Sequence, residues 1–125
     1  MRLLLDTSVL LWTLSGSARI RKIRNLILAD DSEIYVSTAS LWEIAIKSGI
    51  GKLDADVGVI RRAIQESGFI ELAVFGSHIE TVATLPLHHR DPFDRLIIAQ
   101  AMTEPMRLLT GDATLAIYSD LVETI

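Results

Sequence analysis

Short apolar runs alternate along the chain with segments whose apolar residues recur at helical spacing. The runs have the length and the flanking turn or charged residues of buried strands. They cover Arg2–Leu5, Glu33–Ser37, Phe69–Ala73 and Met106–Thr110. Helical spacing is found between them, in Ile20–Ile27, Leu41–Ser48, Val59–Ser67, His78–Leu85 and Leu96–Met102. Alternating strands and helices predict an α/β fold, with a mostly parallel sheet covered on both faces.

The composition favours a packed domain. The 125 residues are 50% hydrophobic and 22% charged, which excludes a disordered chain. No repeat, low-complexity tract or linker-like stretch divides the sequence, so we expect one domain over residues 1–125. Because the chain has no cysteine, disulfides, thiolate metal sites and a cysteine nucleophile are excluded.

The same features predict a cytoplasmic protein. The start, MRLLLDTSVLLWTLSGSA, superficially resembles a signal peptide, but Asp6 interrupts its apolar stretch and no small-residue cleavage motif follows. No apolar run approaches the roughly 18 residues that a membrane span needs. We therefore expect a reducing compartment and no membrane partner.

Four acidic residues lie where a sheet of this class binds its ligands. Such sites are at the carboxyl edge of the strands, where loops lead into helix starts. Asp6 and Asp112 follow the first and last apolar runs, and each also has an ordinary role as the cap of a short helix, VLLWTL or Ala113–Ile117. The other two acids, Glu43 and Asp94, lie near the starts of longer helices.

Glu43 and Asp94 have structural explanations as well. Glu43 fits a capping box with Ser40 and stands four residues before Lys47, which is a favourable helical ion pair. Asp94 lies in the first turn of a helix opened by Asp91-Pro92, where the helix dipole favours an acid. Capping, however, does not account for four carboxylates at one edge.

The convergence of the four acids favours a metal site. Carboxylates that share a site raise one another's pKa unless a cation lies among them. Oxygen ligands without cysteine suit Mg²⁺ or Mn²⁺ better than zinc. Such ions serve phosphoryl transfer, singly or as a pair, by polarising the phosphate and lowering the pKa of water.

The net charge of −4 is compatible with this interpretation. It argues at first against a protein that binds nucleic acid by bulk charge. Without the four predicted ligands, however, the remaining acidic and basic residues balance. The acidity is therefore local, and an RNA substrate is not excluded.

The chain resembles PIN-domain ribonucleases, and within them the VapC toxins of toxin–antitoxin pairs. Four motifs carry the resemblance in order along nearly the whole chain: LLLDTSVLLW, SLWEIAIKSGIGKL, LPLHHRDPFDRLIIAQA and LLTGD. The resemblance implies a PIN-like α/β/α sandwich, a homodimer, and inhibition by a VapB-like antitoxin whose C-terminal segment reaches the cleft.

The resemblance also implies the roles of individual residues. The family's acidic quartet holds one or two Mg²⁺ or Mn²⁺ ions and activates water to cleave RNA, leaving a 5′ phosphate and a 3′ hydroxyl. Supporting hydroxyls fall at Thr7 or Ser8 and at Thr110. Asp91 is assigned to capping, since Asp94 precedes RLIIAQA as the family's third acid does. The implied catalytic and metal-binding residues are Asp6, Glu43, Asp94 and Asp112.

Several basic residues are candidates for contacts with a phosphate. Arg90 and Arg95 flank the third acidic motif and suit a phosphate or an antitoxin carboxylate. A further basic cluster suits RNA phosphates or, equally, a solvated helix face; it comprises Arg19, Arg21, Lys22 and Arg24.

The histidines and tryptophans are assigned mainly structural places. His88 and His89 lie in a loop, where packing or exposure is favoured over catalysis, and His78 is taken as a plain helix residue. Trp12 and Trp42 are expected in the core or in a partner groove rather than as platforms for RNA bases.

Two other functions fit parts of the pattern. A metal-dependent, phosphatase-like hydrolase also places an aspartate after its first strand, but a haloacid-dehalogenase pattern would require a second acid where Ser8 stands. A non-catalytic protein- or RNA-binding α/β domain would use the four acids as caps alone. Metal binding would separate this last possibility from the nuclease.

Overall fold

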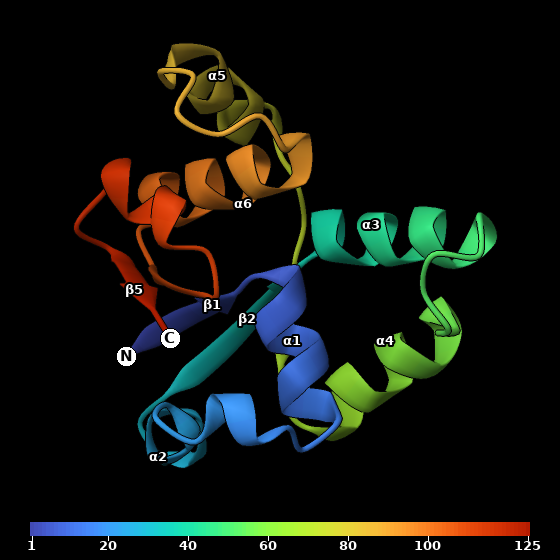
Figure 1. Ribbon diagram of the computed structural model, residues 1–125. Helices are drawn as coiled ribbons and strands as arrows, with labels where there is room; N and C mark the ends of the chain where they lie inside the picture. Colours follow the sequence, from blue (N-terminus) through green and yellow to red (C-terminus); the bar gives the residue numbers. More distant parts are fainter.

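The computed structural model describes residues 1–125 as a parallel sheet between layers of helices (Figure 1). The strands are β1 Arg2–Leu5, β2 Glu33–Ser37, β3 Ile70–Leu72, β4 Arg107–Thr110 and β5 Val122–Thr124. Their order is β3-β2-β1-β4-β5, and every neighbouring pair is parallel. The predicted α/β class and parallel sheet are confirmed.

Helices cover both faces of this sheet. They are α1 Thr7–Leu14, α2 Arg24–Leu28, α3 Thr38–Gly49, α4 Val57–Glu66, α5 Gly76–Thr84 and α6 Pro92–Thr103, with short 3₁₀ helices η1 Ala18–Ile20 and η2 Ala113–Ile117. In Figure 1, α5 and α6 lie on one side of the strands, and α1, α2 and α4 lie on the other. None of these helices combines the length and apolar character needed to cross a membrane.

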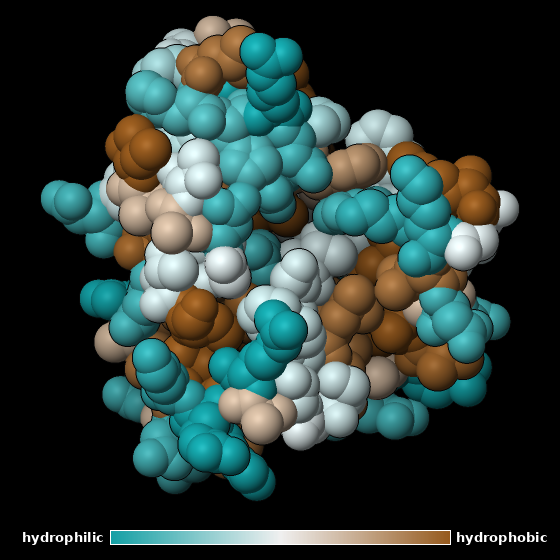
Figure 2. Space-filling model, in the orientation of Figure 1, coloured by the Kyte–Doolittle hydropathy of each residue, from teal (hydrophilic) through white to brown (hydrophobic).

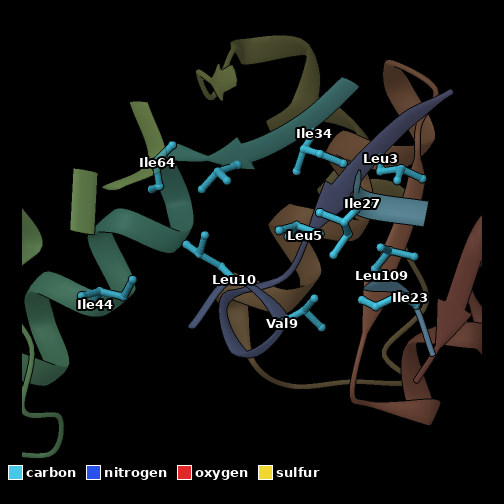
Figure 3. Close-up of a cluster of buried hydrophobic side chains, with 11 residues drawn as sticks. Leu3, Leu5, Val9, Leu10, Ile23, Ile27, Ile34, Ile44, Ile64 and Leu109 are labelled. Carbon is cyan, nitrogen blue, oxygen red and sulfur yellow. The ribbon is translucent and has the colours of Figure 1, made fainter. Parts of the chain in front are cut away.

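The central strand β1 divides the core into two clusters. Side chains alternate between the faces of a strand, so Leu3 and Leu5 join one cluster while Leu4 joins the other. All three are fully buried. Figure 3 shows the first cluster, in which Leu3 and Leu5 meet side chains of the surrounding helices and strands. A strand that is apolar on both faces is thereby fixed at the centre of the sandwich.

Two elements differ from the sequence-based prediction. Strand β5 was not predicted, because its three residues are half-buried or exposed and include a charged glutamate. The predicted helix Ile20–Ile27 is interrupted, since η1 ends at Ile20 and α2 begins only at Arg24. Ile23 and Ile27 are buried on the core side, so the apolar spacing is kept although the helix is broken.

Helix α3 begins earlier than the predicted capping box requires. Its cap is Ser37, the last residue of β2, whose Oγ accepts a hydrogen bond of 3.0 Å from the backbone N–H of Ala39. The capping box of Ser40 and Glu43 is therefore wrong. Glu43 lies in the second turn of α3, and its side chain is free to face the end of the sheet.

Candidate functional site

Three adjacent strands end at the edge where the predicted acids lie. The order β2-β1-β4 places the residues after these strands side by side. Asp6 follows β1, Asp112 follows β4 after one glycine, and Glu43 lies on α3, the helix that follows β2. Asp94 lies in the first turn of α6. The face drawn in Figure 2 is hollowed between α6 and α3.

Asp6 is both the cap of α1 and a buried site residue, with only 4% of its surface exposed. Its Oδ1 accepts a hydrogen bond of 2.8 Å from the backbone N–H of Val9, and its Oδ2 accepts one of 2.5 Å from the hydroxyl of Thr110. Burial raises the pKa of Asp6, although these two hydrogen bonds oppose the rise; the charge of Glu43 adds to it. Thr110 thus fixes the carboxylate in one orientation.

Glu43 is held between a hydroxyl and an ammonium group. Its Oε1 accepts a hydrogen bond of 2.7 Å from the hydroxyl of Thr7, and its Oε2 lies 2.6 Å from Nζ of Lys47. The predicted ion pair between Glu43 and Lys47 is confirmed. The hydrogen bond to Glu43 raises the pKa of Lys47, and the charges of Asp91 and Asp94 act in the same direction. Lys47 therefore feels the acids of α6 as well as that of its own helix.

Asp94 carries the largest electrostatic perturbation of the four acids. Burial, together with repulsion from the charges of Asp91 and Asp6, raises its pKa to about 7. Asp91 is the cap of α6, as predicted: its Oδ1 accepts hydrogen bonds from the backbone N–H groups of Phe93, at 2.8 Å, and Asp94, at 3.2 Å. Asp94 thus lies close enough to the other acids for their negative charges to disfavour its ionised form.

Asp112 is bound by its own helix and by His89. Its Oδ1 accepts a hydrogen bond of 2.9 Å from the backbone N–H of Thr114, while Nε2 of His89 lies 2.6 Å from its Oδ2. Partial burial works to raise the pKa of Asp112, but the hydrogen bonds from His89 and Thr114 outweigh it and hold the pKa below its usual value. Of the acids with a shifted pKa, Asp112 is the one kept ionised by its neighbours.

His89 links two of the acids and has a defined tautomer. Its Nδ1 accepts a hydrogen bond of 3.1 Å from the backbone N–H of Asp91, so the ring proton is assigned to Nε2. That nitrogen then donates to Asp112 and lies 3.5 Å from Oδ2 of Asp94. Sequence reasoning favoured loop packing for this residue. The only signal in the sequence was its position two residues before the cap of the acidic helix.

The supporting hydroxyls differ in what they contact. Thr7 bonds Glu43, whereas Ser8 is exposed and makes no side-chain hydrogen bond. Thr110 bonds Asp6 and also accepts a hydrogen bond of 3.0 Å from the backbone N–H of Asp112. Thr7 and Thr110 are thus the two hydroxyls that the fold brings to the acids.

The two arginines of the acidic motif have different surroundings. Arg90 is exposed, as a contact with a phosphate or a partner would require. The guanidinium of Arg95 instead donates to the carbonyl oxygens of Leu85, at 3.3 Å, and Pro86, at 3.1 Å, and to the hydroxyl of Tyr118, at 3.1 Å. Arg95 therefore holds the loop before α6 in place, and its N–H groups are occupied.

The structure changes the predictions for His78 and Trp42 and agrees with the prediction of packing or exposure for His88. His78 is fully buried rather than a plain helix residue: its Nδ1 accepts a hydrogen bond from the backbone N–H of Phe75, and its Nε2 lies 2.5 Å from Glu104. His88 is exposed and packs against Tyr118. Trp42 is 60% exposed and its ring packs edge-on against Phe93, so of its two predicted places the core is excluded and the partner groove stays a prediction.

The residues present fit a divalent cation. The four acids offer carboxylate oxygens, which Mg²⁺ and Mn²⁺ prefer, and His89 offers a ring nitrogen beside two of them. Ligand atoms of His89, Asp94 and Asp112 lie within 4.8 Å of one another. Burial is the main cause of the raised pKa values of Asp6 and Asp94, and repulsion from neighbouring acids adds to both. A bound cation would relieve that repulsion.

Comparison with known proteins identifies the family. A family model for the PIN domain matches residues 3–121. The chain belongs to the PIN domain family. No curated protein matches the sequence.

Solved structures share the fold of this PIN domain at low sequence identity. A chain of VapBC2 from Rickettsia felis, bound to a DNA fragment from their promoter, is 16% identical with a TM-score of 0.74 over 99% of this chain and 98% of that chain. A chain of a toxin–antitoxin complex from Klebsiella pneumoniae is 19% identical, with a TM-score of 0.68. The match covers 97% of this chain and 95% of that chain. A domain of a functionally unknown protein from Methanocaldococcus jannaschii is 16% identical, with a TM-score of 0.58. The match covers 99% of this chain and 90% of that chain. The PIN-like sandwich is therefore shared, although few residues are.

Proposed function

We propose that this PIN domain is a metal-dependent endoribonuclease. The observation that carries the proposal is the gathering of four carboxyls, Asp6, Glu43, Asp94 and Asp112, at one edge of the sheet; the raised pKa values of Asp6 and Asp94 support it. Groups with such perturbed pKa values are concentrated at functional sites. PIN domains are nucleases, and membership of the family supports nuclease activity.

The four carboxylates would hold one or two Mg²⁺ or Mn²⁺ ions. When bound, these ions would polarise the scissile phosphate and lower the pKa of water. The chain's own part is to fix the ligands: Thr110 orients Asp6, and Thr7 orients Glu43. Preorganised carboxylates need little rearrangement when the substrate phosphate arrives. The expected products carry a 5′ phosphate and a 3′ hydroxyl.

The direct test is cleavage of RNA by purified protein. We expect cleavage with Mg²⁺ or Mn²⁺, none with EDTA, and near-complete loss for Asp94→Asn and Asp6→Ala. Asp120→Asn changes an exposed aspartate outside the four acids and serves as the matched control. A folded Asp94→Asn protein that cleaves RNA as fast as wild type would contradict the proposal.

We further propose that the nuclease is the toxin of a toxin–antitoxin pair in the cytoplasm and that it forms a homodimer. Similarity of fold to a chain of VapBC2 and to a toxin–antitoxin complex supports a VapB-like antitoxin as partner. Expression of the wild-type chain should stop bacterial growth, and Asp94→Asn should not. A dimer predicts twice the chain mass of 13.8 kDa by light scattering. Equal growth with both proteins would leave no support for the toxin.

The alternatives give different results in the same experiments. A non-catalytic binding domain would neither bind Mn²⁺ at the four acids nor cleave RNA. A phosphatase-like hydrolase would bind metal and release phosphate from small phosphomonoesters, but leave RNA chains intact. Sequencing RNA ends after expression of wild type and Asp94→Asn would also identify the target RNA.

A further inference from the structure

The largest hollow of the molecule lies away from the acidic edge, at the other end of α1. It is a cavity of about 780 Å³ formed by the end of α1, η1, α2 and the turn between α4 and β3. Ile20 and Ile27 contribute its apolar floor, and Phe69 contributes an aromatic face. Its volume lies within the range of about 300–1,000 Å³ that is usual for ligand sites in proteins. A nucleotide-sized group would therefore fit.

The rim of this cavity carries a positive charge that the chain does not neutralise. Arg21 and Arg24 line it, and Arg19 and Lys22 lie beside them in the sequence; all four side chains are exposed. No acid occurs between residues 7 and 29. The ion pairs of the structure all involve other side chains. In a chain of net charge −4, this is a local reversal of sign.

The cavity and the acidic edge lie at opposite ends of one short helix. Thr7, at the start of α1, bonds Glu43, and Thr13, near its end, lines the cavity. Thr7 and Thr13 are six residues apart, which is a rise of about 9 Å along the helix axis. This distance corresponds to roughly three nucleotides of a stacked strand. Figure 2 shows hydrophilic side chains gathered over α2, at the lower left. An RNA strand that reaches the acids therefore has this basic rim within reach.

We infer that the cavity is an RNA-binding site separate from the acids, which holds a nucleotide a few positions from the cleaved bond. Arg21 and Arg24 bind the phosphates, the hydroxyls of Ser17 and Ser67 face the sugar, and Phe69 receives the base. This inference rests on the proposed ribonuclease function. It locates substrate affinity in a part of the chain that the acidic edge does not supply.

The test is RNA binding in EDTA, where no cleavage occurs. The probe is a fluorescent single-stranded oligonucleotide, and the variant is Arg21→Ala/Arg24→Ala. We expect its affinity to fall by about tenfold or more, and the slope of log K against log salt to decrease by about 1.4, or roughly 0.7 for each lost phosphate contact. Arg62→Ala, an exposed arginine on α4 away from the cavity, should leave both quantities unchanged. Crosslinks from a thiouridine-containing probe should map to the cavity.

The outcomes separate this inference from the proposed function. Unchanged affinity and salt slope in the double variant overturn the RNA-binding site, even if the wild type cleaves RNA. Unchanged RNA binding with weaker inhibition by a VapB-like antitoxin also overturns it, and assigns the cavity to an acidic peptide. Loss of binding in the variant, with no metal-dependent cleavage by the wild type, supports the RNA-binding site and rejects the nuclease.

Discussion

At the scale of single residues, the chemistry of the acidic edge is set by how each carboxyl is paired. Asp6 and Glu43 each receive a hydroxyl hydrogen bond, and Asp112 receives the N–H of His89. Asp94 has only the more distant His89, at 3.5 Å, to offset burial and three neighbouring acids. Asp94 is therefore the acid of the candidate site whose ionised form costs the metal-free protein most.

The first prediction concerns the stability of the metal-free protein. Because the pKa of Asp94 is raised from 3.8 to about 7 by folding, the protonated side chain stabilises the fold at low pH, and this stabilisation is lost as the pH rises through about 7. Asp94→Asn cannot ionise and should escape the loss. We expect the variant to gain stability relative to wild type between pH 4 and pH 8, by up to about 4 kcal/mol. Thermal unfolding in EDTA at several pH values measures it.

Asp120→Asn controls for the loss of one negative charge, because Asp120 is exposed. It should show no comparable change between pH 4 and pH 8. A difference between Asp94→Asn and wild type that stays constant with pH would show that Asp94 is not the group responsible.

The second prediction concerns His89 as a positioning residue for Asp112. Its Nε2–H holds Oδ2 of Asp112, so His89→Ala should release that carboxylate. We expect Mn²⁺ affinity, measured by titration calorimetry, to fall roughly 10- to 100-fold, as is typical when a residue supporting a metal ligand is removed. His89→Gln keeps an N–H donor and should recover part of the loss. Equal affinity in all three proteins would exclude a positioning role.

At the scale of elements, α1 packs closely against the turn after β4 that leads to Asp112. The backbone of Gly111 is not in the left-handed region, so its φ does not require glycine. Instead, a Cβ at this position would lie 2.6 Å from a ring carbon of Trp12. Trp12 packs against the core cluster, as predicted, which limits how far its ring can move.

The third prediction follows from this contact. Gly111→Ala should force the ring of Trp12 or the turn to move and should cost about 1–3 kcal/mol of unfolding free energy. Gly49→Ala is the matched control: a Cβ there meets open space at the end of α3, so the change should be neutral or stabilising by up to about 1 kcal/mol. Denaturant unfolding compares the two. A Gly111→Ala protein as stable as Gly49→Ala would show that the ring yields freely.

At the scale of the whole molecule, charge is divided between the two ends of α1. The acids gather at the carboxyl edge of the sheet, and the unpaired bases gather around the cavity at the far end of the helix. A polyanionic substrate would be repelled by the first region until cations occupy it, and attracted by the second. Divalent metal and RNA are therefore expected to bind interdependently.

The fourth prediction is that Mn²⁺ stabilises the folded protein as a whole. A cation that binds only the native acidic edge stabilises it by mass action, by about 2.7 kcal/mol at a concentration 100 times its Kd. The midpoint temperature of thermal unfolding should therefore rise with Mn²⁺ in the wild type, and should rise much less in Asp6→Ala. Equal shifts in both proteins would place the bound ion elsewhere.

Much of the architecture was predictable because it depends on neighbours in the sequence. The apolar runs that became β1, β2, β3 and β4 are visible locally, and so are the caps Asp6, Asp91 and Asp112. The start of α3 was missed because Ser37, at the end of a strand, competes with Ser40 for the role of cap. Local patterns thus locate elements well, and boundaries less well.

The sequence by itself determined the class of fold and the position of the four acids at strand ends and helix starts, since these are local features. Only the tertiary structure decided how the acids are paired. Thr110 and Asp6 are 104 positions apart, and His89 and Asp112 are 23 apart, so their contacts depend on strand order and on the path of the loop before α6. Burial, which raises the pKa of Asp94, is likewise a property of the packed molecule and not of any segment.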